Sequence, residues 1–110
     1  MTRGLVIETD GSLRVFNEHD DLSDAVGGYL EGITGYRWSA YVNEEGKLKG
    51  MNLNTLATMA LVELGWGLGD YIAGPLVLFG SVDAEGNDTS VDVDIEKNVR
   101  ALSKIYCNLI

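Results

Sequence analysis

The sequence predicts a small α+β domain, in which about three helices pack on one antiparallel or mixed sheet. Its 110 residues are enough for one hydrophobic core and too few for two, so we expect a single domain spanning residues 1–110. Hydrophobic residues make up 45% and charged residues 23%, which is typical of a globular protein. Strand-like and helix-like runs alternate along the chain, which favours helices covering one sheet.

The N-terminal segment predicts a β-hairpin followed by a helix. Gly4–Ile7 and Leu13–Phe16 are rich in β-formers, and Asp10-Gly11 between them is a hairpin turn signal. The acidic run 20–24 supplies N-cap residues for a helix that we expect to continue to about Leu30.

The middle of the chain predicts a strand, a turn and the most strongly helical segment. Polar and apolar residues alternate over Tyr36–Val42, which indicates a strand. Asn43–Gly46 reads as a turn in which Gly46 is available for a positive φ. Thr55–Leu64 is apolar nearly all round and stops at Gly65, so we expect it to be the central buried helix.

The C-terminal part predicts strands, an acidic loop and a last helix. The glycine-rich segment 65–69 reads as a connection, and we expect Tyr71–Gly74 and Pro75–Gly80 to be strands, the second of them central. Residues 81–92 form an acidic loop, and a helix is predicted after a cap at Asp94. The apolar stripe of this last helix is Ile95, Val99, Leu102, Tyr106 and Leu109.

The formal net charge of −9 and the pI near 4.3 disfavour direct binding to nucleic-acid phosphates, which requires clustered Lys and Arg. The acids gather in the two ends of the chain, whereas residues 32–62 hold three bases against two acids. Acidic ends keep a small protein soluble, and the same distribution is compatible with a central segment that is free to meet an anion. The chain has no apolar run long enough to span a membrane, so we expect no membrane partner. Its one cysteine, Cys107, suits a reducing environment, so we expect a cytoplasmic protein.

The chain offers little for catalysis or metal binding. Its one histidine, His19, would have to serve as the base of any Ser–His or Cys–His pair. The acidic run from Asp83 to Asp94 begins with calcium-like spacing, but Asp88 stands where an EF-hand requires glycine. We therefore expect no catalytic residues, no metal ligands and no cofactor, and we expect that the protein is not an enzyme.

The strongest candidate for a ligand site lies just before the predicted central helix. Helix N-termini present unpaired N–H groups that favour anions, and Lys47 and Lys49 add positive charge there. An aromatic residue, Trp66, could stack on a ring-bearing ligand. A solvated turn followed by ordinary helix capping explains the same residues without a ligand. The candidate ligand-binding residues are Arg37, Asn43, Lys47, Lys49, Asn52, Asn54 and Trp66.

The same stretch carries a family resemblance. Residues 41–50, followed by 52–58, resemble the signature of domain-of-unknown-function family 3846, and the likeness continues through 69–80 and the turn at 83–86. It covers roughly residues 5 to 95. The resemblance implies a small phage or prophage accessory protein acting in the bacterial host cytoplasm, and it implies no particular activity.

Two classes of function remain open at this point. One is a non-catalytic counter-defence protein that sequesters a small anionic, nucleotide-type ligand, which fits the lysines before the central helix. The other is an acidic inhibitor or DNA mimic that binds a host nucleic-acid enzyme, which fits the charge of −9. We also expect a homo-oligomer, because the apolar run Tyr71–Phe79 predicts sheet edges that need cover.

Overall fold

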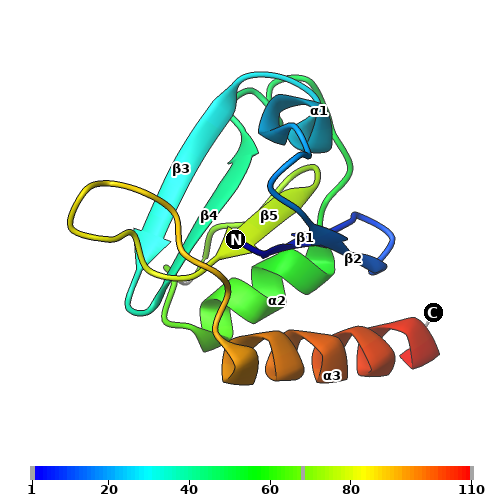
Figure 1. Ribbon diagram of the computed structural model, residues 1–110. Helices are drawn as coiled ribbons and strands as arrows, with labels where there is room; N and C mark the ends of the chain where they lie inside the picture. Colours follow the sequence, from blue (N-terminus) through cyan, green and yellow to red (C-terminus); the bar gives the residue numbers. More distant parts are fainter. Residues whose placement is uncertain (1, 68, 110) are drawn as a thin grey trace.

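One antiparallel sheet and three helices are formed by residues 2–67 and 69–109, the part of the chain that the computed structural model describes (Figure 1). The strand order is β2-β1-β5-β4-β3, and every neighbouring pair is antiparallel. This confirms the predicted α+β class and selects the antiparallel form of the sheet. The elements are β1 (Gly4–Ile7), β2 (Leu13–Phe16), α1 (Leu22–Val26), β3 (Leu30–Gly35), β4 (Trp38–Asn43), α2 (Thr55–Glu63), β5 (Leu76–Phe79) and α3 (Val93–Leu109).

Strand β5 lies at the centre of the sheet, as its apolar sequence predicts. Leu78 is paired with Leu5 of β1 on one side and with Ala40 of β4 on the other. All four residues of β5 are buried because the chain covers both faces of the sheet. A strand buried on both faces reads as a continuous apolar run rather than an alternating one.

Each face of the sheet has its own hydrophobic cluster. Leu76 and Leu78 point toward α2 and α3, where they join Leu61 and Ile95 in the larger core. Alternate residues of β5 point the opposite way and pack with Val26 of α1 in a smaller cluster. Figure 1 shows α2 and α3 stacked together on one side of the sheet.

Helix α2 is apolar on most of its surface because it is enclosed between two layers. Leu56, Ala57, Ala60 and Leu61 are buried in the core that α2 shares with the sheet and with α3. The prediction of a central buried helix is confirmed, with Glu63 as its last residue.

The segment after α1 differs from the prediction. The helix ends at Val26 rather than near Leu30, because Gly27 adopts a left-handed conformation (φ +82°) and terminates it. The chain then forms β3, a strand that the sequence pattern did not reveal because Gly32 and Gly35 lower its β propensity.

Three further expectations need correction. Tyr71–Gly74 is not a strand: it makes an isolated bridge between Ala73 and Leu53, and Gly74 leaves the extended conformation (φ +90°). Helix α3 includes Asp94 in its first turn instead of starting after it. Gly46 does not adopt a positive φ; a Cβ there would lie 2.6 Å from the carbonyl oxygen of Ala73, so close packing requires the glycine.

The edge strands of the sheet are β2 and β3. The apolar run Tyr71–Phe79, which was expected to leave sheet edges in need of cover, instead contains the central strand β5. Because β5 is central, the physical reason given above for self-association is wrong. The glycine-rich connection before β5 includes Leu68, which lies outside the described residues. Across the described ranges, none of the helices has the length and apolar character needed to cross a membrane.

Replacing Leu61 by Ala should lower the free energy of unfolding by about 2–5 kcal/mol, because the side chain is fully buried between the sheet and α3. Met59→Ala on the same helix is the control: Met59 is 37% exposed, and its loss should cost about 1 kcal/mol or less. Urea denaturation followed by circular dichroism measures both. Equal costs for the two variants would contradict a buried face of α2 at Leu61.

Candidate functional site

A cavity of about 310 Å³ opens beside β3 and β4. One wall comes from these two strands, and a second comes from the turn that follows β4. The third wall is the segment that leads from α2 to β5. The cavity is lined by Glu31, Ile33, Val42, Asn43, Glu44, Gly46, Lys47, Leu48, Trp66, Asp70, Tyr71, Ile72 and Ala73.

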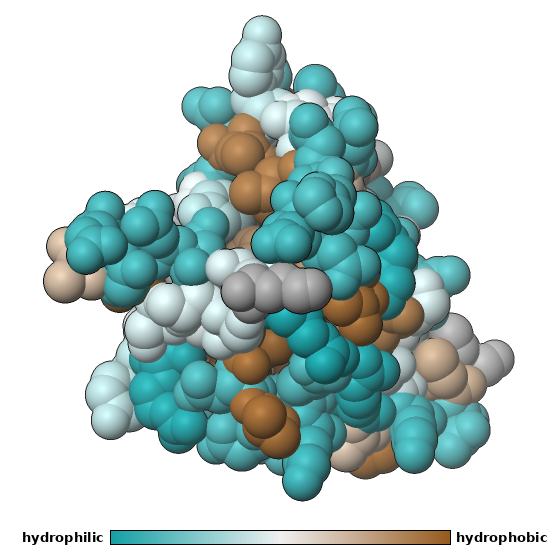
Figure 2. Space-filling model, viewed as in Figure 1, coloured by the Kyte–Doolittle hydropathy of each residue, from teal (hydrophilic) through white to brown (hydrophobic). Residues whose placement is uncertain are grey.

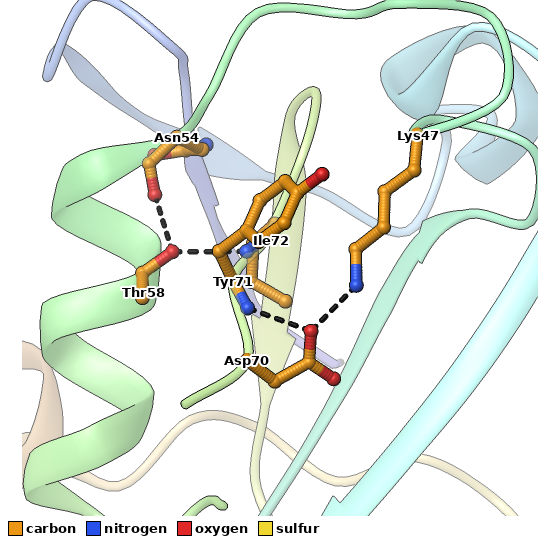
Figure 3. A network of polar contacts seen from close by, with 6 residues as sticks. All are labelled: Lys47, Asn54, Thr58, Asp70, Tyr71 and Ile72. Carbon is orange, nitrogen blue, oxygen red and sulfur yellow. Dashed lines mark hydrogen bonds and ion pairs between the residues drawn. The ribbon is translucent and has the colours of Figure 1, made fainter. Parts of the chain in front are cut away.

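Lys47 reaches across this cavity from the turn to the opposite wall. Its Nζ lies 2.5 Å from Oδ1 of Asp70 and 4.4 Å from the ring centroid of Tyr71 (Figure 3). The same carboxylate oxygen accepts a hydrogen bond from the backbone N–H of Tyr71 at 2.7 Å. Hydrogen bonding to Lys47 lowers the pKa of Asp70, and hydrogen bonding to Asp70 raises the pKa of Lys47. The ammonium is thus held between a carboxylate and an aromatic face.

The cavity lining carries more acidic than basic side chains. Among its described residues, Lys47 is the one cation, whereas Glu31, Glu44 and Asp70 contribute three carboxylates to the lining. The rest of the lining is mostly apolar and includes the rings of Trp66 and Tyr71. Such a site can hold a ring, accept hydrogen bonds from donor groups and pair with one anionic group.

Asn54, expected as a ligand residue, is fully buried and caps α2 instead. Its Oδ1 accepts a hydrogen bond from the N–H of Ala57 at 3.0 Å, and its Nδ2 donates to the carbonyl oxygens of Ile7 and Gly74. The start of α2 is therefore closed by the protein's own side chain. The N-cap sequence signal was correct, and the capping interpretation accounts for it.

Thr58 connects α2 to the cavity wall. Its hydroxyl donates to the carbonyl of Asn54 at 2.8 Å and accepts a hydrogen bond from the N–H of Ile72 at 2.9 Å (Figure 3). The N–H of Asn54 donates in turn to the carbonyl of Ile72 at 2.8 Å. These bonds fix the segment that carries Tyr71 and Asp70 against the first turns of α2.

Asn43 lines the cavity, but its amide group is used within the protein. Nδ2 donates to the carbonyl of Val26, 3.2 Å away, and Oδ1 accepts from the N–H of Glu45 at 2.8 Å. The side chain is buried and holds the end of β4 against α1. Its role in the described structure is to position the turn that carries Lys47.

Arg37 lies away from the cavity, at the tip of the β3–β4 hairpin. It pairs with Asp92 at 2.7 Å and with Asp94 at 3.1 Å, so it joins the hairpin to the start of α3. The pKa of Arg37 is raised chiefly by the charge of Asp94. The Nζ of Lys49 lies 3.9 Å from Oε1 of Glu45, and Lys49 is not part of the cavity lining.

The structure therefore brings three of the seven expected ligand residues together at the cavity: Asn43, Lys47 and Trp66. The other four lie outside the cavity. Of these, Asn52 is exposed just before α2, and its backbone carbonyl accepts a hydrogen bond from the N–H of Gly74. The residues outside the cavity are Arg37, Lys49, Asn52 and Asn54.

Sequence reasoning missed the partners of Lys47. Asp70 and Tyr71 follow the glycine-rich connection, and an acid next to an aromatic residue after such a loop was the available signal. Glu31 was missed because β3 itself was not predicted. Within the described ranges, the structure contains no group of three or more His, Cys, Asp or Glu side chains placed to hold a metal ion.

The fold and the cavity define a class: a small α+β protein with a ligand-sized cleft at one end of an antiparallel sheet. The model of the family "Domain of unknown function (DUF3846)" matches residues 1–103, and the chain belongs to this family. No curated protein and no solved structure gives a significant match. The resemblance noted in the sequence is thus confirmed.

Asn54→Ala should lower the free energy of unfolding by about 2–4 kcal/mol, because it removes a helix cap and the buried side-chain donor to the carbonyl groups of Ile7 and Gly74. Asn52→Ala, two residues earlier on the exposed turn, should change it by less than about 0.5 kcal/mol. Chemical denaturation compares the two directly. A stable Asn54→Ala protein would show that the amide is not a structural requirement.

The pKa of Asp70 should rise toward its ordinary value in Lys47→Met, because the hydrogen bond from Lys47 is the main cause of its depression. A depressed pKa means that this pairing stabilises the fold above the pKa that Asp has in the unfolded chain. That stabilisation is lost as pH falls through the lower, folded-state pKa. Carboxyl ¹³C NMR titration measures the shift, with Lys49→Met as control. An Asp70 pKa that is the same in wild type and Lys47→Met would contradict the pairing.

Proposed function

We propose that this protein is a non-catalytic binder that sequesters a small anionic, nucleotide-type ligand in the cavity around Lys47. The observation that carries the proposal is one ammonium group, held over the ring of Tyr71 and paired with Asp70, in a cavity of about 310 Å³ that Trp66 also lines. That volume lies at the small end of the range of ligand pockets, about 300–1,000 Å³.

The charges of the lining suggest how such a ligand would bind. Lys47 pairs with one phosphate group, and Trp66 packs against the base. The carboxylates of Glu31 and Glu44 accept hydrogen bonds from exocyclic amino groups. Because Lys47 is the one cation among the described lining residues, a monophosphate or a cyclic phosphate fits better than a triphosphate, whose extra charges would face those carboxylates.

Asp70 competes with the ligand for Lys47. In the free protein its carboxylate is 2.5 Å from the ammonium, so a phosphate has to displace it or share the lysine with it. This competition lowers affinity for weak anions and leaves a phosphate, with its higher charge density and three acceptor oxygens, as the favoured partner.

The biological setting proposed for this activity is counter-defence. The resemblance to a phage and prophage-associated family implies action in the bacterial host cytoplasm, where removing a nucleotide-derived signal needs binding and no chemistry. The acidic protein-binding inhibitor, or DNA mimic, is the alternative, and it rests on the charge of −9 rather than on the cavity.

The test is a screen of nucleoside monophosphates and cyclic mono- and dinucleotides by native mass spectrometry, followed by calorimetry on the mononucleotide that binds most tightly. Lys47→Ala should weaken its binding about ten- to a hundredfold, because one charge-assisted contact contributes roughly 1.5–3 kcal/mol. Lys49→Ala is the matched control, since it removes the same charge from the same turn but outside the cavity.

Equal effects of the two lysine variants would place the site elsewhere. If none of the nucleotides binds at millimolar concentration, the ligand proposal fails. Capture of a basic nucleic-acid enzyme from host lysate would then favour the acidic inhibitor.

A further inference from the structure

Strand β3 leaves one of its two sides unpaired in the described structure. It is the last strand of the sheet and pairs only with β4. The backbone bond from Glu44 N–H to the carbonyl of Tyr29 shows which residues bond inward. In an antiparallel pair the bonded residues alternate, so Tyr29, Glu31, Ile33 and Gly35 bond toward β4. The N–H and C=O groups of the remaining β3 residues, Leu30, Gly32 and Thr34, point outward.

This edge has few of the features that usually protect an edge strand, and Glu31 is its one charged residue. Natural edges carry lysine, proline or a bulge, or they are very short. From Leu30 to Gly35 the six-residue strand has no lysine or proline, and its register with β4 is unbroken. The opposite edge, β2, is only four residues long and carries Arg14, which pairs with Glu8 at 3.6 Å. Two exposed tyrosines flank the open edge: Tyr29 is 74% and Tyr36 85% exposed.

The surface around the sheet offers no broad apolar face in the view of Figure 2, where the hydrophobic patches are small and separated by hydrophilic side chains. Two copies of this chain, each with a charge of −9, repel one another over most of their surfaces. The stretch from Tyr29 to Tyr36 is an exception, because Glu31 is its one charged residue.

We propose that a second copy of this chain pairs with this edge, β3 against β3, to form one continuous antiparallel sheet across a two-fold axis at Ile33. The two-fold axis is perpendicular to the sheet, so the side chains of opposed residues lie on the same face. One residue of β3 must then lie opposite the same residue of the second copy, and the axis passes between the two. Centring on Glu31 would place two carboxylates opposite each other. Centring on Gly32 would leave them on a close diagonal, about 7–8 Å apart.

Centring on Ile33 removes this repulsion and covers exposed apolar side chains. Glu31 then lies opposite Gly35 of the second copy, and the two Ile33 side chains form a β-branched cross-strand pair. Leu30, which is 38% exposed, lies opposite the exposed Tyr36. Gly32 and Thr34 exchange the outward backbone hydrogen bonds. Because Glu31 and Ile33 also line the cavity, the second copy would stand at its rim, on the same face of the joined sheet.

Cysteine cross-linking tests both the contact and its register, in a Cys107→Ser background that removes the exposed native thiol. Ile33→Cys should give a disulfide-linked dimer under mild oxidation, because opposed residues in a non-hydrogen-bonded pair have Cα atoms about 4.5 Å apart. Thr34→Cys should give no such dimer, because the Cα atoms of residue 34 in the two copies would lie farther apart than the ~7 Å limit for a disulfide. Cross-linking at Thr34 and not at Ile33 would overturn the proposed register.

Light scattering over a concentration series tests the same contact without the Ile33 substitution. The wild-type mass should rise from 11.9 kDa toward twice that value. Thr34→Lys should weaken dimerisation at least tenfold, since a lysine on an edge strand blocks pairing. Asn17→Lys, which adds the same charge just after β2, is the control and should dimerise as the wild type does.

A single 11.9 kDa species up to hundreds of micromolar would overturn the proposal. So would a dimer that Thr34→Lys leaves intact, because that dimer must use another surface. Neither result bears on ligand binding by Lys47, which is measured separately on the same proteins.

Discussion

The buried amide of Asn54 holds together the parts of the chain on which the rest of the structure depends. It accepts a hydrogen bond from the first turn of α2 and donates to β1 and to the backbone just before β5. A fully buried amide is stable only when its donors and acceptor are all used, so its partners must stay in one arrangement. Helix α2, β1 and the segment just before β5 are therefore joined by the hydrogen bonds of a single side chain.

The cavity follows from this constraint. Thr58 and Asn54 fix the backbone of Ile72, and the chain on either side of that point then presents Asp70 and Tyr71 to Lys47. Asn43 performs the corresponding task on the other wall, where its amide ties the start of the turn to α1. Two asparagines that resemble ligand residues in the sequence thus support the cavity through the backbone, and Lys47 is the charged side chain that this arrangement leaves facing the cavity.

Much of the fold could be predicted because it rests on local signals. The apolar run of β5 and the capped, apolar segment of α2 are continuous in sequence, and their burial follows from hydrophobicity alone. Strand β3 could not be predicted in this way, because Gly32 and Gly35 give no β signal and the strand exists only by its pairing with β4. Two charged residues of the candidate site were missed because they reach it through the tertiary structure: Glu31 belongs to that strand, and Asp70 meets Lys47 across 23 residues of chain.

The sequence by itself determined the α+β class, the family, the central helix and strand, and the segment around Lys47 as the place to look for a ligand. Those features depend on composition, periodicity and helix capping, which neighbouring residues encode together. Only the tertiary structure decided which polar groups remain available. It used the amides of Asn43 and Asn54 internally, because buried donors and acceptors must find partners wherever the packed chain brings them. It also brought the exposed Arg37 next to Asp92, which lies 55 residues away in the sequence.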